Sequence, residues 1–218
     1  MAATTTYDIA VKGDPKSKKL GDCPFCHRAL LTLEEKKASY DKTYISFDNK
    51  PKWLFEVNPE GSVPVMKVLD DGKWVVGSGD IADYLEDQIP EPSLGKAEDQ
   101  TKVASGILPK FVQFLTADKA DEAEKQKALE TELDELNKFL EGNGPYLGGD
   151  KFIAADAALS PKLHHIDVAA KALKGYSIPS SLTAVHTYIQ KVASRPSWKA
   201  TQYSDDFVIA GWKGKMKS

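Results

Sequence analysis

The sequence predicts an α/β domain at residues 1–89 followed by an all-helical domain at residues 97–218. In the first region, short β-branched and aromatic runs alternate with runs of helical spacing. Residues 90–96 contain two prolines and a glycine and interrupt every periodic pattern, which is typical of a linker. After them, the apolar residues repeat at three or four positions, as on a helix. A length of 218 residues allows two small domains of this kind.

The first domain is predicted to run strand, helix, strand, short helix, strand, strand, helix. Alternation of apolar and polar residues marks the first strand at Tyr7–Val11, and an apolar stripe marks the helix at Ala29–Lys37. The other elements are a loop at Gly13–Gly21, strands at Thr43–Phe47, Val63–Leu69 and Lys73–Val76, a connection at Asn49–Asn58 and a helix from Ser78. With two cysteines before the first helix, this order is similar to that of a thioredoxin-like domain.

The second domain is predicted to be helical throughout. Its helices are expected at Val103–Leu115, Leu129–Leu140, Ala154–Ala172 and Leu182–Ala193, before a tail that carries Trp212. Gly106 and Pro109 should bend or break the first of them. Asp156, at a helix start, is interpreted as a cap rather than a catalytic group. His164 and His165 are adjacent, so they point in different directions, and we interpret them as packing and surface residues rather than metal ligands.

The segment Gly21–Arg28 is the strongest candidate for chemistry because it holds both cysteines of the chain. Cys23 is expected at or just before the start of a helix, with Pro24 at the first helical position, where a missing N–H costs nothing. The unpaired backbone donors and the helix dipole there favour a thiolate. The sequence therefore predicts that Cys23 is a reactive, ionised thiol.

Two structural interpretations of the cysteine pair are weaker. A zinc site needs about four ligands, and His27 is the only other candidate nearby in the sequence, so no metal is expected. A structural disulfide would close a loop too short to restrain much chain entropy. Cys26 lies one helical turn after Cys23 and has two open roles. It either resolves an oxidised Cys23 or is a buried core residue.

Composition excludes other classes of function. A net charge of −3 argues against general nucleic-acid binding. A basic cluster before Cys23 is either a solvated loop or an attraction for an anionic substrate; it consists of Lys12, Lys16, Lys18 and Lys19. No apolar run approaches the roughly 20 residues of a membrane span, and Met1–Thr6 lacks the apolar core of a signal peptide. We therefore expect no membrane partner and a reducing, cytoplasmic setting, or a plastid form whose transit peptide has been removed.

Several motifs, in this order, resemble one family. They are Gly21–Phe25, Leu30–Lys36, Asn58–Val65, Gly144–Tyr146, Ala155–Asp156, Pro161–Leu163 and Ile209–Trp212. A thioredoxin-like domain, a linker and a helical domain are the layout of the glutathione transferase fold, and within that fold the motifs resemble the plant and algal dehydroascorbate reductases. The resemblance runs over essentially the whole chain.

The resemblance implies an oxidoreductase that reduces dehydroascorbate to ascorbate in a ping-pong cycle. Glutathione would be the co-substrate, with no bound cofactor, and the protein is expected to be a monomer. Cys23 would attack dehydroascorbate and become oxidised, and two glutathione molecules would then restore it. Lys12 and Asp22 would bind dehydroascorbate beside Cys23, with Lys12 also stabilising the thiolate.

The glutathione site follows by position from the same resemblance. Phe25 would form a wall of the thiol pocket, Lys50 would lie on the glycyl side, and Ser78 with its helix N-terminus would bind the γ-glutamyl carboxylate. The loop Val63-Pro64, with a cis proline, would present the backbone groups of Val63 to the cysteinyl part of glutathione.

Three positions depart from the family pattern. Gly77 stands where an acidic residue is usual before the serine, which puts a contact to the glutathione amino group in doubt. Ile153 stands where a hydroxyl cap is common, and Cys26 stands where many relatives have serine. The last departure permits an internal disulfide with Cys23.

Two other functions are compatible with parts of the sequence. A glutaredoxin-like or omega-type thiol transferase, acting on mixed disulfides, is compatible with the C-x-x-C pair. A non-enzymatic protein similar to the chloride intracellular channels has the same fold, but the first domain lacks an apolar insertion segment.

Overall fold

The computed structural model describes residues 6–96 and 101–216. The prediction that Met1–Thr6 is not a signal peptide concerns residues that lie almost wholly outside these ranges. The described chain forms two compact units, one of residues 6–96 with Pro196–Ser204 and one of residues 101–195 with 205–216. Within the described residues, no helix combines the length and apolar character needed to cross a membrane.

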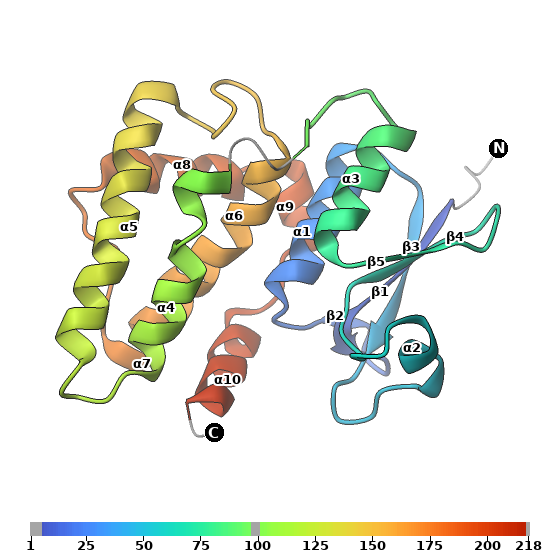
Figure 1. The fold of residues 1–218 in the computed structure, drawn as a ribbon, viewed down its shortest axis with the longest axis horizontal. Helices are drawn as coiled ribbons and strands as arrows, with labels where there is room; N and C mark the ends of the chain where they lie inside the picture. The colour runs from blue at the N-terminus through green and yellow to red at the C-terminus, as the bar shows by residue number, and fades with distance from the viewer. Residues whose placement is uncertain (1–5, 97–100, 217–218) are drawn as a thin grey trace. The chain divides into compact units, whose positions relative to one another are not determined.

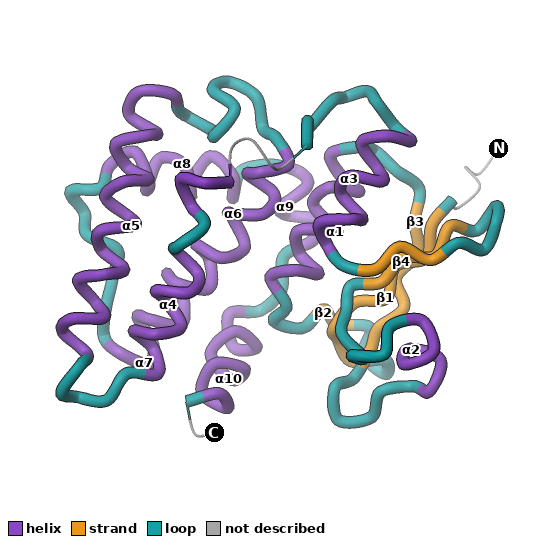
Figure 2. The backbone as a smooth tube through the Cα atoms, viewed as in Figure 1, coloured by secondary structure: helices purple, strands orange, loops and turns teal. Residues whose placement is uncertain are grey.

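The first unit is built on a mixed five-stranded sheet, drawn in orange in Figure 2. Its strands are β1 (Tyr7–Asp14), β2 (Lys19–Leu20), β3 (Tyr40–Ile45), β4 (Val65–Val68) and β5 (Trp74–Val76). Central β1 runs parallel to β3 and antiparallel to β4, and β5 pairs antiparallel with β4. Because β2 pairs with the end of β1, the predicted loop at Gly13–Gly21 contains a short hairpin.

Four helices belong to this unit. They are α1 (Pro24–Glu35), α2 (Lys52–Val57), α3 (Ser78–Gln88) and α9 (Pro196–Thr201). Figure 1 shows α1 and α3 side by side against one face of the sheet. Ile9 and Val11 of β1 point into this layer with Leu30 of α1, and all three side chains are essentially inaccessible to solvent. The apolar face of β1 and the apolar stripe of α1 therefore pack into one core.

Helix α9 packs on α1 although it is distant in sequence. The ring of His27 lies 4.4 Å from that of Trp198, and its Nε2 is 3.0 Å from the Thr201 hydroxyl. Ser197 also donates a hydrogen bond to the Glu35 carboxylate. The predicted domain limits stay a prediction, but the compact first unit includes this segment from the predicted helical domain.

The second unit is helical. Its α-helices are α4 (Ile107–Thr116), α5 (Glu122–Asn143), α6 (Ala154–His165), α7 (Lys171–Lys174), α8 (Thr183–Ala193) and α10 (Asp205–Lys215), with a 3-10 turn η2 (Thr101–Ala104) and a π-helical turn η3 (Ile166–Ala170). The predicted class of an α/β region followed by an all-helical one is thus confirmed. Trp212 of α10 packs inside this unit, 4.9 Å from the ring of Phe111, and donates a hydrogen bond to His165 Nδ1.

Two helical predictions need correction. The predicted helix Ala154–Ala172 is divided, because η3 follows α6 with wider turns before α7. The predicted break at Pro109 is wrong. Pro109 lies in the first turn of α4, where its missing N–H removes no helical hydrogen bond, and Gly106 is the residue that precedes the helix.

Asp156 caps α6 from within the helix, as the sequence predicted. Its carboxylate accepts hydrogen bonds from the backbone N–H groups of Ile153, at 2.8 Å, and Leu147, at 2.9 Å. Ile153 is the N-cap residue and offers no acceptor of its own. Burial raises the pKa of Asp156 to about 6, despite the lowering effect of these two N–H groups.

Replacing Asp156 with alanine should lower the free energy of unfolding by about 2 kcal/mol, because two backbone donors lose their acceptor. Since the folded pKa lies above the unfolded value of about 3.9, the folded protein binds more protons between pH 4 and 6, and wild-type stability falls as the pH rises through this window. The stability gap between wild type and Asp156→Ala should thus be larger at pH 4 than at pH 7. Urea denaturation followed by circular dichroism measures both effects. The exposed Asp150→Ala is the matched control, and an equal loss in both variants would contradict the capping role.

Candidate functional site

Cys23 is the N-cap residue of α1, as predicted. Its backbone is extended, with φ −102° and ψ 109°, and Pro24 begins the helix. The Cys23 Sγ accepts a hydrogen bond from the backbone N–H of Cys26 at 3.4 Å. The sulfur therefore takes the place that a serine or aspartate oxygen commonly takes at a helix start.

The pKa values of the two thiols are shifted in opposite directions. The pKa of Cys23 lies below its ordinary value because the Cys26 thiol donates to it, helped by the N–H groups of Cys26 and Phe25 and by the charge of Lys12, while burial opposes this. Burial first, and then Cys23 itself, raise the pKa of Cys26 well above its ordinary value. Both cysteines are free, and Cys26 is buried with its Sγ accepting the Lys12 N–H at 3.4 Å. These surroundings thus favour the thiolate form at Cys23 and the neutral form at Cys26.

Lys12 and Asp22 form an ion pair next to the thiol. The Lys12 Nζ lies 2.5 Å from Asp22 Oδ1, and the Gly21 N–H donates to the Lys12 carbonyl at 2.8 Å. These contacts join the end of β1 to the residues before α1. Because the ammonium of Lys12 partly neutralises the Asp22 carboxylate, the negative charge beside Cys23 opposes ionisation of the thiol less than a lone carboxylate would.

The other lysines of the predicted basic cluster do not join this pair. Lys16, Lys18 and Lys19 are exposed, and the turn that carries them is held by Asp14, which accepts from the Lys16 N–H at 2.9 Å. They occupy a solvated hairpin instead. Of the four lysines, Lys12 alone contributes to the lowered pKa of Cys23.

Val63, Pro64 and Ser78 come together where β4 meets the start of α3. The Val63–Pro64 peptide bond is cis, and the Gly77 N–H donates to the Pro64 carbonyl at 3.0 Å. Within the described residues, neither backbone polar group of Val63 has a hydrogen-bond partner. An extended peptide could therefore pair with Val63 as a further strand residue would.

Ser78 is the first residue of α3. The backbone N–H groups in the first turn of this helix have no partner within the helix. Gly77 precedes it with φ +93°, in the region that favours glycine, and provides no side-chain cap. Glycine adopts this backbone conformation without strain. A side chain at this position would be strained, and the polar groups at the start of α3 are therefore its backbone N–H groups and the Ser78 hydroxyl.

Two further predicted residues, Phe25 and Lys50, belong to the candidate site. Phe47, which no sequence pattern singled out, contacts Lys50 and Lys12. Phe25 is 47% exposed beside the thiol. The Lys50 Nζ lies 4.4 Å from the ring centroid of Phe47, and the Lys12 Nζ lies 5.1 Å from the same centroid. Phe47 carried no signal of its own, because its nearness to Lys12 arises from the parallel register that pairs Lys12 with Ile45.

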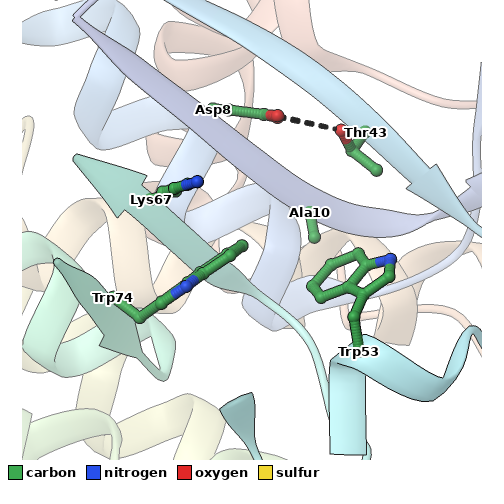
Figure 3. A pocket seen from close by; sticks show the side chains of 6 residues that line it. All are labelled: Asp8, Ala10, Thr43, Trp53, Lys67 and Trp74. Atoms are coloured by element: carbon green, nitrogen blue, oxygen red, sulfur yellow. Dashed lines mark hydrogen bonds between the residues drawn. The ribbon is translucent and has the colours of Figure 1, made fainter. Parts of the chain in front are cut away.

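A separate hollow lies on the face of the sheet that points away from α1. It has a volume of about 250 Å³ and is lined by Asp8, Ala10, Thr43, Trp53, Lys67 and Trp74. Figure 3 shows small Ala10 beside the indole ring of Trp53, which stacks on that of Trp74 with the ring centroids 5.4 Å apart. Asp8 accepts a hydrogen bond from Thr43 at 2.9 Å, and the Lys67 Nζ lies 5.7 Å from the Trp74 ring. None of the predicted site residues lines this hollow, and one cation faces one carboxylate there.

The chain is similar to known proteins over nearly its whole length. The family descriptions "Glutathione S-transferase, N-terminal domain" and "Glutathione S-transferase, C-terminal domain" match residues 22–88 and 119–191. The chain is 40% identical to the chloroplastic glutathione S-transferase DHAR3 of Arabidopsis thaliana over 215 residues, which cover 98% of this chain and 82% of that protein. It is 41% identical to the probable cytosolic glutathione S-transferase DHAR1 of Oryza sativa subsp. japonica over 209 residues, 96% of each chain.

A solved structure is similar over the same extent. The crystal structure of Chlamydomonas reinhardtii dehydroascorbate reductase superposes with a TM-score of 0.90 at 40% sequence identity. The match covers 97% of this chain and 99% of that one.

Proposed function

We propose the function of this chain from one premise: it belongs to the dehydroascorbate reductase family of the glutathione transferases. The predicted glutathione transferase fold is confirmed by the two family matches and by the structural likeness. The proposal is that the chain is an oxidoreductase that reduces dehydroascorbate to ascorbate with glutathione as co-substrate. The observation that carries it is the acidic Cys23 thiol at the start of α1, hydrogen-bonded by Cys26.

The proposed cycle is a ping-pong sequence through Cys23. The thiolate attacks a carbonyl carbon of dehydroascorbate. Water then bonds to the sulfur, the sulfur–carbon bond breaks, and its electron pair stays on carbon, so that ascorbate leaves and Cys23 becomes a sulfenic acid. One glutathione thiol displaces this oxygen as water and forms a mixed disulfide. A second glutathione thiolate attacks the glutathione sulfur, which releases glutathione disulfide and the Cys23 thiolate.

The residues near the thiol have separate proposed roles in this cycle. The Cys26 thiol donates to Cys23 and makes it a better leaving group in the last step. Lys12 and Asp22 bind the polar edge of dehydroascorbate beside the sulfur. Cys26 as a resolving thiol stays the alternative role, although its raised pKa disfavours the thiolate that attack would need.

Glutathione is proposed to bind along β4 and the start of α3. The free backbone groups of Val63, next to cis Pro64, would pair with its cysteinyl unit. Ser78 and the first N–H groups of α3 would hold the γ-glutamyl carboxylate. Lys50 would attract the glycyl carboxylate, and Phe25 would cover the thiol.

The deciding experiment compares two oxidised substrates on the purified protein with glutathione as reductant. We expect kcat/KM for dehydroascorbate to exceed that for a cysteine–glutathione mixed disulfide by at least about tenfold, a difference of about 1.4 kcal/mol in transition-state binding. The reverse order would favour the omega-type thiol transferase. If the protein acts on neither substrate, both enzymatic proposals are wrong.

The acidity of Cys23 has its own expected result. Its rate of alkylation by iodoacetamide should stay high through pH 7, because the lowered pKa keeps the thiolate present below the usual value of about 8.5. Cys26 should remain unmodified in the folded protein, since it is buried and neutral. Mass spectrometry of the two cysteines as a function of pH measures both. A midpoint for Cys23 at or above 8.5 would contradict the thiolate mechanism.

We retain the cytoplasm as the proposed compartment and a monomer as the proposed state. Two free cysteines suit a reducing environment, which the chloroplast stroma also provides. The similar plant proteins are named for both compartments.

A further inference from the structure

Phe47 is the one side chain of the described residues that contacts both lysines of the predicted substrate sites. The Lys12 Nζ lies 5.1 Å and the Lys50 Nζ 4.4 Å from its ring centroid. Cations at these distances are attracted by the negative face of an aromatic ring. One ring thereby attracts both ammonium groups.

The backbone around Phe47 explains how the ring reaches both lysines. Ile45, the last residue of β3, pairs with Lys12 in the parallel register of β3 and β1. Phe47 follows two residues later in a turn closed by the Asn49 N–H, which donates to the Ser46 carbonyl at 3.3 Å. The same turn brings Lys50 back over the ring. A connection of five residues thus links the two proposed substrate sites.

Phe47 contributes little to the packing of the first unit. Its side chain is 44% exposed and lies outside the buried core of the sheet. Burial of apolar surface therefore does not account for an aromatic residue here. The contacts that its ring makes with Lys12 and Lys50 are electrostatic.

The contacts of the two lysines differ. Lys12 is also held by Asp22 at 2.5 Å, and its charge contributes to the acidity of Cys23. Lys50 has no partner other than Phe47 within the described residues. Loss of the ring should hence free Lys50 completely and leave Lys12 drawn towards Asp22.

We propose that Phe47 is a positioning residue, whose ring holds Lys50 for the glycyl carboxylate of glutathione and Lys12 beside the Cys23 sulfur. This inference deepens the proposed function and rests on it for the identity of the ligands. A flexible lysine loses rotamer entropy when it binds a carboxylate, and a ring that already restricts Lys50 reduces that loss.

The test replaces Phe47 by leucine, which keeps apolar volume but removes the ring, and by tyrosine, which keeps the ring. For Phe47→Leu we expect the dissociation constant of S-methylglutathione, measured by calorimetry, to rise about two- to fivefold, the size of one exposed cation–π contact. We expect the alkylation midpoint of Cys23, which also depends on Asp22 and Cys26, to rise by about 0.3 pH unit. Phe47→Tyr should match wild type in both measurements.

Phe55→Leu is the matched control. Phe55 belongs to the same unit and is 46% exposed, and no cation lies over its ring in the described part of the chain. Thermal unfolding should be similar for all three variants. Wild-type affinity and midpoint in Phe47→Leu, or equal changes in Phe55→Leu, would overturn the inference.

Both readouts are independent of dehydroascorbate turnover. If the protein fails to reduce dehydroascorbate but Phe47→Leu still weakens S-methylglutathione binding, the proposed reaction fails and the positioning role stands. If turnover is normal and Phe47→Leu leaves binding and alkylation unchanged, the reaction stands and the positioning role fails.

Discussion

Replacing Cys23 with serine should lower kcat/KM for dehydroascorbate by at least about a thousandfold. The serine hydroxyl would keep the N-cap hydrogen bond to Cys26 N–H, so the start of α1 should remain intact. A hydroxyl at that position is not ionised near neutral pH and cannot form a disulfide with glutathione. Steady-state kinetics with glutathione and dehydroascorbate, beside a thermal unfolding curve, separates loss of chemistry from loss of fold.

Substitutions of Cys26 complete this experiment. Cys26→Ser keeps a hydrogen-bond donor towards Cys23 and should retain most of the activity, whereas Cys26→Ala removes the donor that contributes most to the lowered pKa of Cys23. Cys26→Ala should therefore lose more activity at pH 6.5 than at pH 8.5. Robust turnover by Cys23→Ser, or complete loss in Cys26→Ser, would overturn the assignment of Cys23 as the sole nucleophile.

The start of α1 could be predicted because its signals are local. A cysteine followed by proline, with an apolar stripe downstream, specifies an N-cap and a helix within a few residues, and the structure has both. The same holds for Asp156 at the start of α6. The order of strands and helices along the first unit followed from the alternation of patterns, and the family resemblance supplied the expected roles of Val63, Pro64 and Ser78.

What the sequence did not reveal depends on contacts between distant segments. Phe47 gains its neighbours from the register of β3 against β1, which no local pattern specifies. The divided helix after α6 and the association of α9 with α1 arise from packing. Gly77 illustrates a third kind of gap. Its departure from the family was visible in the sequence, whereas its positive φ is a backbone property that only the structure supplies.

A buried lysine, Lys36, fixes the predicted linker to the first unit, and no sequence pattern indicated this contact. The Lys36 side chain is fully buried at the end of α1 and forms an ion pair with Glu86 of α3. Its ammonium donates to the carbonyls of Ile89, at 2.7 Å, and Pro92, at 2.9 Å. These bonds satisfy all three protons of the ammonium. Lys36 thus connects α1, the end of α3 and the segment at residues 90–96.

Glu86 holds the same segment from the other side. Its carboxylate accepts hydrogen bonds from the Ser93 hydroxyl at 2.6 Å and from the N–H groups of Leu94 and Gly95 at 3.0 and 3.1 Å. Burial alone would raise its pKa, but these donors and Lys36 lower it to about 2. Because the folded pKa lies below the unfolded one, this contribution to stability is present above about pH 4.3 and is lost as the pH falls towards 2.

Lys36→Met should lower the free energy of unfolding by about 3–5 kcal/mol, because methionine fills the methylene space but leaves a partly buried carboxylate and two carbonyls without their cation. Urea denaturation at pH 7 measures the loss, and Lys37→Met, at an exposed neighbouring lysine, should change little. Adding Glu86→Gln to Lys36→Met should cost less than the two single losses together, since the charge that Lys36 compensated is then absent. Additive losses would show that the two side chains act separately, and a loss below about 1 kcal/mol in Lys36→Met would show that solvent replaces the ion pair.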